Sequence, residues 1–308
     1  MEFQEFSKKA IKRIDKQLDL LLAEWRKEVE KIDKKLLPLV DKFIVSCSGG
    51  KRIRGVLVVL GYEIAKGQNN SDVIPANAGI QLNKSRSELD PRLRGDDRKQ
   101  NEEIYKIAAA YEILHSAVLV HDDVIDQSPK RRGQPSLYRA IGRGHYGISQ
   151  AISLGDAGFF LAMKIISEAK FSSERKIPAL ELFSKVMLDT ALGEILDLEK
   201  ADPLVVAKLK TAYYTISGPL QLGAALGGGG QKIVRDFRVF GEGLGVAFQI
   251  KDDLLDGETD FWGGAEKAKN KAEKYIDQAM KILPEITKDS NMSKLLEQMA
   301  EWLVKRNK

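Results

Sequence analysis

The spacing of apolar residues is the feature that most constrains this fold, because such residues recur every three to four positions along most of the chain. Between about Phe6 and Val45 they follow one face of one or two amphipathic helices. Few segments alternate with a period of two, and none flanks a hairpin turn. The sequence therefore predicts an all-α fold, with helices over about 6–45, 56–65, 102–126, 149–169, 177–200, 205–226, 235–255, 266–283 and 293–305.

Composition narrows the classes of protein that fit. The chain has 308 residues, 43% of them hydrophobic, which is enough for the core of one large or two small domains. Its net charge of +5 is spread among interleaved acids and bases, which favours a solvated surface over a nucleic-acid partner. The single cysteine, Cys47, excludes an intrachain disulfide and a cysteine-based zinc site. With no signal peptide and no transmembrane segment, we expect a cytoplasmic protein.

Two stretches interrupt the helical pattern. Residues 71–98 combine turn residues with mixed charge, and a connection of about 28 residues is long for a compact bundle. We therefore predict an inserted, surface-exposed loop there. The glycine run at 227–230 lacks the Gly-Lys-Ser/Thr ending of a phosphate-binding loop, so we interpret it as a turn between helices.

The segment HDDVIDQSPKRRG, residues 121–133, concentrates opposed charges directly after an apolar run. On a helix, Asp122 and Asp126 lie one turn apart on the same face, with Asp123 on the neighbouring flank. At about 6 Å and an effective dielectric near 20, two such charges repel by roughly 3 kcal/mol, so they need a counter-charge. A lysine or arginine side chain and a divalent cation both satisfy this need.

A second carboxylate pair favours a divalent metal ion over a basic side chain as the counter-charge. In FQIKDDLLD, Asp252 and Asp256 again stand one turn apart at the end of an apolar helix. If the two helices are neighbours, their carboxylates face one another, and several metal ions neutralise them. Magnesium held this way usually also binds substrate phosphates. The sequence therefore predicts a magnesium site formed by two carboxylate ladders, which are Asp122 with Asp126 and Asp252 with Asp256.

Basic residues complete the predicted site. Glycines precede Lys51, Arg52 and Arg54 at the start of a helix, where backbone amides also favour an anion. Arg131 and Arg132 follow the first ladder, and their planar guanidinium groups match phosphate oxygens. Each basic cluster alone is also compatible with an ordinary surface. Beside two ladders and an apolar helix, these residues indicate a ligand with a diphosphate head and a hydrocarbon tail.

The motifs resemble those of the trans-isoprenyl diphosphate synthases, or polyprenyl synthetases, in the same order along the chain. The resemblance spans about residues 10 to 260 and rests on GGKRIRG, HSAVLVHDDVIDQSPKRRGQPS, the Gly-Asp pair of SLGDAG, GEILDLE, the Lys210-Thr211 pair and GLGVAFQIKDDLLD. It implies a single domain over residues 1–308, folded as an isoprenoid-synthase-type bundle around a central cavity, and usually a homodimer. It also implies that isopentenyl diphosphate and an allylic diphosphate are the substrates.

The resemblance also implies roles for individual residues. Asp122, Asp126, Asp252 and Asp256 would hold Mg²⁺ on the allylic diphosphate, and Arg131 would grip the same diphosphate. Isopentenyl diphosphate would bind to Lys51, Arg54, His115 and Arg132, although His115 and His121 are also compatible with core histidines. Lys210, Thr211 and Gln249 would line the wall near the developing allylic cation. The released diphosphate would accept the proton, so no dedicated base is needed.

Product length would depend on the residues below the first ladder. Ala117 and Val118 are small where aromatic residues in the family stop growth at farnesyl length, while Leu114 and Tyr111 lie deeper on the same helix. We therefore expect a geranylgeranyl or somewhat longer product, and we expect that the substitution Ala117→Phe would shorten it.

The chain departs from the family after Asp260. The family continues with lysine-bearing segments that help to close the site, whereas this chain passes through FWGG directly to a near-terminal helix. Lys267 and Lys269 are candidate replacements. This apparent deletion keeps open an alternative, a weakly catalytic prenyl-diphosphate-binding or regulatory subunit. A terpene cyclase is a further alternative, but the intact DDLLD argues against it.

Overall fold

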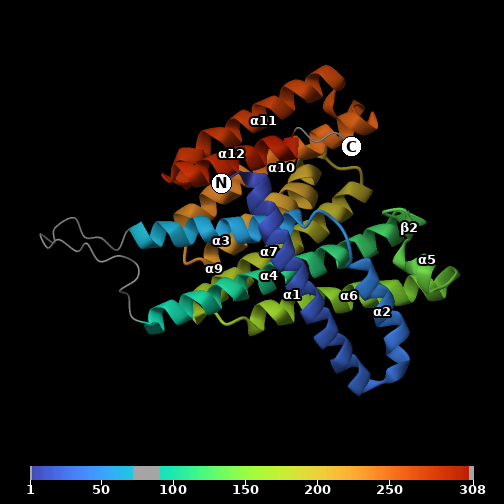
Figure 1. Cartoon of the computed structure of the whole chain (residues 1–308). Coiled ribbons are helices and arrows are strands. Elements are labelled where there is room, and N and C mark those ends of the chain that lie inside the picture. Colours follow the sequence, from blue (N-terminus) through green and yellow to red (C-terminus); the bar gives the residue numbers. More distant parts are fainter. Residues whose placement is uncertain (1, 72–90, 305–308) are drawn as a thin grey trace, which may run out of the picture. The chain divides into compact units, whose positions relative to one another are not determined.

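The protein is all-α, as predicted. A computed structural model describes residues 2–71 and 91–304 (Figure 1). In chain order its elements are α1 (Phe3–Ile32), η1 (Lys34–Leu36), α2 (Leu37–Ser46), α3 (Ile53–Ser71), α4 (Pro91–Ile125), β1 (Lys130–Arg131), β2 (Gln134–Pro135), α5 (Leu137–Ile141), α6 (Gly144–Glu168), α7 (Ser173–Leu198), α8 (Pro203–Val206), η3 (Ala207–Ser217), α9 (Gly218–Leu226), α10 (Gln231–Asp256), η4 (Asp260–Trp262), α11 (Ala265–Ile286) and α12 (Ser290–Val304).

The described chain divides into two compact units. Unit 1 draws on residues 1–9, 56–104 and 171–308, and unit 2 draws on residues 10–55 and 105–170. Helices α1, α3 and α4 each contribute residues to both units. The prediction of a single domain over 1–308 stays a prediction, because compactness alone does not show that a unit folds by itself.

In unit 2, α4 and α6 approach each other closely at two glycines of α6. A β-carbon placed on Gly155 would lie 2.4 Å from the ring of His121, and one on Gly158 would lie 2.9 Å from the β-carbon of Ala117 on α4 and 2.6 Å from the ring of Phe43 on α2. Trp25 packs edge-on against Phe43, with ring centroids 5.8 Å apart. The glycine of the SLGDAG motif is therefore needed for packing, because any side chain at Gly155 would push α6 away from α4.

In unit 1, α10 packs against η3, α9 and α11. Their shared apolar cluster includes Ala212, Val246, Ile250 and Trp262. The η3 segment is a π-helix of 11 residues, a rare conformation that occurs mostly at functional sites. The pattern of apolar residues predicted a helix over 205–226 but gave no sign of this wider turn.

The structure corrects several details of the predicted elements. A loop was predicted over residues 71–98, but helix α4 begins at Pro91, so residues 91–98 are helical. The remainder of the predicted loop, residues 72–90, lies outside the described residues. A two-residue antiparallel ladder, β1–β2, and the short helix α5 were not predicted. The turn at 227–230 is confirmed between α9 and α10. Within the described ranges, no helix is both long and apolar enough to cross a bilayer.

Candidate active site

The first carboxylate ladder stands at the end of α4, in unit 2. The N–H of Asp126 donates to the carbonyl of Asp122 at 2.8 Å, so the two residues keep their one-turn spacing although α4 ends at Ile125. Asp123 is 3% exposed, and its Oδ1 accepts from Nη2 and Nε of Arg131 at 2.6 and 2.9 Å. The middle carboxylate is therefore neutralised by Arg131, and the outer two carboxylates form the ladder.

The loop before α3 presents the predicted basic residues. Gly49 and Gly50 have φ of 71° and 93°, and Arg52 has φ of 51°, which is unusual for a residue with a side chain. Arg52 is buried and donates to Asp15 at 2.8 Å and to the carbonyl of Cys47 at 3.0 Å. Arg52 therefore holds the loop in shape, which leaves Lys51 and Arg54 as the predicted ligand-binding residues of this motif.

A buried carboxylate that the sequence analysis missed lies beneath this loop. Glu112 on α4 accepts the N–H of Gly55 at 2.8 Å, and its other oxygen is 3.8 Å from Nη1 of Arg52. Glu112 is 3% exposed, and this burial raises the pKa of its carboxyl. Its position one turn before His115 in an otherwise apolar stretch is the signal that was available in the sequence.

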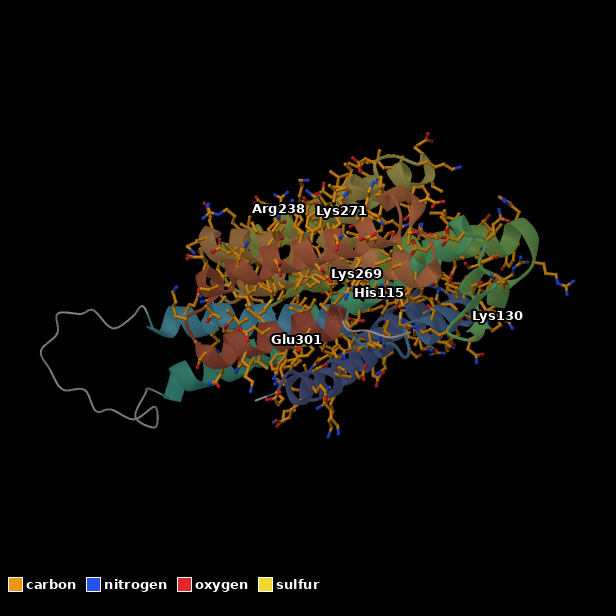
Figure 2. All side chains as sticks on the ribbon, turned by 90° about the horizontal axis from the view of Figure 1, so that it is seen from above. His115, Lys130, Arg238, Lys269, Lys271 and Glu301 are labelled. Atoms are coloured by element: carbon orange, nitrogen blue, oxygen red, sulfur yellow. The ribbon has the colours of Figure 1, made fainter. Side chains whose placement is uncertain are left out.

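His115, labelled in Figure 2, lies on α4. Its Nε2 is 3.2 Å from Nη1 of Arg54, at the start of α3. Burial, and then the nearby charges of Arg54 and Arg132, hold the pKa of His115 well below its ordinary value. His115 is therefore neutral near pH 7, and Nε2 accepts the hydrogen bond from Arg54. By contrast, His121 stacks on Phe159 with ring centroids 5.1 Å apart.

The β1–β2 hairpin brings Arg132 to the basic loop. Arg132 donates to the carbonyl of Ser48 at 2.8 Å, and a β-carbon placed on Gly50 would lie 2.9 Å from Nη2 of Arg132. Like Arg52, Arg132 has a positive φ, here 50°. Unit 2 thus brings Arg54, His115 and Arg132 together around one loop, while Arg131 donates to Asp123.

The predicted chain-length residues differ in the directions they face. Tyr111, Leu114 and Ala117 are buried, and Val118 is partly buried. Since a helix turns about 100° per residue, Val118 and Tyr111 share the face of Asp122, whereas Ala117 lies on another flank. The β-carbon of Ala117 lies 2.9 Å from one placed on Gly158, so Ala117 faces α6.

In unit 1, Lys210 on η3 is bound to the GEILDLE motif of α7. Its Nζ lies 2.9 Å from Glu194 and 2.6 Å from Asp197. Burial disfavours the charged form of Lys210, but the hydrogen bonds to these two carboxylates outweigh it and raise the pKa of the amine. A β-carbon on Gly193 would lie 2.5 Å from the backbone nitrogen of Lys210, so glycine lets α7 approach η3.

A chain of three hydrogen bonds links the other wall residues of unit 1. The hydroxyl of Thr211 donates to Oε1 of Gln249 at 2.6 Å, Nε2 of Gln249 donates to Asp253 at 2.8 Å, and Nε1 of Trp262 donates to Asp253 at 2.7 Å. We call these four residues the Trp262 relay. Trp262 is 5% exposed, and the ammonium of Lys271 lies 5.1 Å from its ring centre.

The second ladder ends α10 and repeats the arrangement of the first. Asp252 and Asp256 are one turn apart on the same helical face, and Gly257 ends the helix with a φ of 82°. The middle residue, Asp253, is again held by donors of its own unit, here Gln249 and Trp262. In both motifs the middle carboxylate is therefore structural, and the two outer ones form the ladder.

The donors of each ladder fit a hard divalent cation. Carboxylate oxygens are the ligands that Mg²⁺ prefers, usually one or two per ion together with water and phosphate oxygens. Across the residues that the structure describes, no three or more His, Cys, Asp or Glu side chains gather closely enough to form a metal cage by themselves. Two carboxylates per ladder therefore fit an ion that is completed by phosphate oxygens.

The lysines proposed to replace the missing closing segment lie on α11. Lys267 and Lys269 are exposed, and the Lys267 side chain comes within 3.2 Å of a β-carbon placed on Gly263 (Figure 2 labels Lys269). Lys271, which the sequence analysis did not select, is the α11 lysine that stands over Trp262. The FWGG segment thus packs into the core of unit 1 through its tryptophan.

The sequence of this chain is similar to one protein family and to individual proteins of known activity. The family model described as polyprenyl synthetase matches residues 38–271. A geranylgeranyl diphosphate synthase of Sulfolobus acidocaldarius is 32% identical over 167 residues, which is 51% of this chain and 48% of that protein. A geranylfarnesyl diphosphate synthase of Methanosarcina mazei is 31% identical over 217 residues, which is 68% of this chain and 58% of that protein.

Solved structures share the fold. A geranylgeranyl pyrophosphate synthase from Corynebacterium glutamicum, complexed with isoprenyl diphosphate and magnesium, superposes with a TM-score of 0.74 at 20% identity and covers 100% of both chains. At this identity the likeness concerns the fold alone. The match spans about half of the length of the two curated relatives named above, 48% and 58%.

Proposed function

Because the chain belongs to the polyprenyl synthetase family, we propose that it condenses isopentenyl diphosphate with an allylic diphosphate to give a longer trans-polyprenyl diphosphate. The family model covers residues 38–271, about three quarters of the chain. The observation that carries the proposal is the repeated motif in which the middle carboxylate is held internally and two outer carboxylates share a helical face.

Magnesium is the cofactor that we propose for both ladders. Asp122 and Asp126 would hold it in unit 2, and Asp252 and Asp256 in unit 1. When bound, the ions supply positive charge that stabilises the departing diphosphate. The fit rests on the oxygen donors and on their one-turn spacing.

The basic residues of unit 2 would hold the diphosphate of isopentenyl diphosphate. Lys51, Arg54 and Arg132 supply the charge, and Arg54 is oriented by the neutral His115. Because His115 accepts from Arg54, its Nε2 is not available as a base, which agrees with proton loss to the released diphosphate. Arg131 would reach an allylic diphosphate only by leaving Asp123, which accepts from it at 2.6 Å.

The wall residues of unit 1 would face the allylic cation while the double bond of isopentenyl diphosphate attacks it. Thr211 and Gln249 present lone pairs whose orientation is fixed by the Trp262 relay. Lys210 is neutralised by Glu194 and Asp197, so it adds a positioned dipole more than a net positive charge beside the cation.

The product that we propose is geranylgeranyl diphosphate or a somewhat longer homologue. Val118, rather than Ala117, lies on the helical face of Asp122, so Val118→Phe is the sharper test of the slot. The substitution Ala117→Phe would instead displace Phe43 and α6, because Gly158 leaves no room for a ring. Product analysis by mass spectrometry with several allylic primers would show a shorter main product for Val118→Phe.

A homodimer is the assembly that we propose. On α6, Ile152, Phe160 and Met163 are 38%, 70% and 39% exposed on one face. On α7, Leu188, Leu192 and Ile195 follow the spacing of one helical face and are 58%, 47% and 56% exposed. Exposed apolar stripes of this kind mark protein interfaces. A cytoplasmic location, expected from the sequence, stays a prediction.

The second candidate is a prenyl-diphosphate-binding or regulatory subunit with weak activity. The short connection between α10 and α11 favours it, because the lysines that close the site in the family are missing. The test is a steady-state assay with radiolabelled isopentenyl diphosphate and farnesyl diphosphate. Condensation that depends on Mg²⁺ supports the enzyme, whereas binding without condensation would support the subunit.

A further inference from the structure

Unit 2 contains a cavity on a different face of α4 from the ladder. The cavity, of about 330 Å³, lies between α2, α4, the β1–β2 hairpin and α5, and we call it the α2–α4 cavity. From α4 it is lined by Ser116, Leu119, Val120 and Asp123. At about 100° per residue, this face is roughly a third of a turn away from the face of Asp122, Val118 and Tyr111. The α2–α4 cavity is therefore distinct from the proposed tail slot.

The carboxylates that line the cavity are already neutralised. Asp41 accepts from Nε of Arg26 at 2.6 Å, and Asp123 accepts from Arg131 at the same distance. Neither carboxylate therefore offsets a further positive charge at the wall.

Two more cations line the cavity and contact only backbone carbonyls among the described residues. Lys42 donates to the carbonyl of Ala140 at 2.7 Å, and Arg132 donates to that of Ser48 at 2.8 Å. Arg131 is the third cation of the wall, so three cations face two carboxylates there, Asp41 and Asp123. The wall thus carries an excess of positive charge that an anion would relieve.

A buried hydroxyl in the cavity wall lacks a partner. Ser136, just before α5, is 1% exposed, and its Oγ makes no hydrogen bond to any residue that the structure describes. Leaving such a group unpaired costs about 1–3 kcal/mol. An acceptor oxygen or a water molecule attached to a bound anion would satisfy it.

An apolar part of the wall is formed by Val45, Leu119, Val120, Pro135 and Leu137. Gln134 and the small polar residues Ser46, Ser48 and Ser116 also line the cavity. We propose that the α2–α4 cavity binds a five-carbon isoprenoid diphosphate as a non-reacting ligand. Its diphosphate contacts Lys42, Arg132 and Ser136, and its hydrocarbon part lies on the apolar wall. A cavity of this volume is at the lower end for small-molecule sites, which favours the five-carbon unit.

Binding in this cavity inhibits the condensation at high isopentenyl diphosphate. This consequence rests on the proposed function, in which Arg132 also holds the substrate diphosphate. An anion in the cavity competes for Arg132 and draws it away from Ser48, so the two sites bind with negative coupling.

The test counts binding sites by calorimetry, with isopentenyl diphosphate as the probe and EDTA present, so that no turnover occurs. The wild-type chain should bind two equivalents. Ala140→Trp, which fills the rim of the cavity, should bind one, and Lys42→Gln should weaken that second equivalent about tenfold. Arg54→Leu should lose the other equivalent. Lys31→Gln on the exposed face of α1 is the charge-matched control and should bind as the wild type does.

A single wild-type equivalent that responds only to Arg54→Leu would overturn the inference. So would an inorganic diphosphate affinity for the cavity equal to that of isopentenyl diphosphate, because the apolar wall would then select nothing. If the chain bound two equivalents of isopentenyl diphosphate but showed no condensation activity, the proposed function would be wrong and the ligand site in the cavity would still be supported. In an active chain, Ala140→Trp should raise the inhibition constant for excess isopentenyl diphosphate at least about fivefold, with kcat unchanged.

Discussion

The Trp262 relay makes a prediction that does not depend on catalytic activity. Trp262→Phe keeps an aromatic ring in the core of unit 1 but removes the N–H that donates to Asp253 at 2.7 Å. A hydrogen bond to a charged group contributes about 1.5–3 kcal/mol. The smaller ring adds a cavity cost, because Trp262 is 5% exposed. We expect the free energy of unfolding to fall by about 2–4 kcal/mol.

The measurement is urea unfolding followed by far-UV circular dichroism, since the substitution removes a tryptophan fluorophore. Trp25→Phe is the matched control in unit 2, where the indole packs edge-on against Phe43 and its N–H makes no hydrogen bond among the described residues. Its cost should stay below about 1 kcal/mol. Equal losses for the two variants would refute the argument that the indole N–H anchors Asp253.

A double-mutant cycle tests whether the relay acts as one unit. Thr211→Val removes the hydroxyl at the far end, where Thr211 donates to Gln249. If Trp262 and Asp253 fix the amide of Gln249, Trp262→Phe and Thr211→Val should couple by about 0.5–1 kcal/mol. The reason is that a disordered Gln249 amide no longer accepts a stable hydrogen bond from the Thr211 hydroxyl. Additive losses would show that the hydrogen bonds are independent.

Three further predictions concern other parts of the site. Glu112→Ala should lower the free energy of unfolding by about 3–5 kcal/mol, because Arg52 loses a buried counter-charge and the N–H of Gly55 loses its acceptor. Glu112→Gln should lower it by only about 1–2 kcal/mol. Equal effects of the two substitutions in urea unfolding would argue against a role for the charge. His115 has a lowered pKa in the folded state, so the unfolded state binds its proton first and stability falls as pH drops below about 6.5. Between pH 7.5 and 5.5 the wild type should lose about 1 kcal/mol more than His115→Gln, and parallel pH profiles would contradict this assignment. Gly193→Ala should destabilise unit 1 by about 1–3 kcal/mol, since its β-carbon would lie 2.5 Å from the backbone of Lys210, and a neutral effect on the melting temperature would show that α7 can shift.

The sequence shows the candidate ladder residues more clearly than the residues that hold the two motifs in place. Asp122 and Asp252 were recognisable because repeated carboxylates at one-turn spacing need a counter-charge. Glu112 and Trp262 were missed, because a single buried acid or aromatic residue has no periodic signal and its role depends on contacts distant in sequence. The start of α4 was placed too late, since Pro91 is a favourable first residue of a helix but the charges after it show no apolar stripe.

The contrast between the two middle carboxylates bears on the deletion that the sequence analysis expects after Asp260. Asp123 is held by Arg131, eight residues later and still within the ladder motif. Asp253 is held by Trp262, which belongs to the FWGG segment directly after Asp260. The tryptophan is buried and packs with α10 in the core of unit 1, so this segment fixes the middle carboxylate of the second motif. The sequence analysis expects a deletion after this segment, and the residue that fixes Asp253 lies before it. We therefore predict that such a deletion affects closure over a bound diphosphate, and so turnover, more than formation of the second ladder.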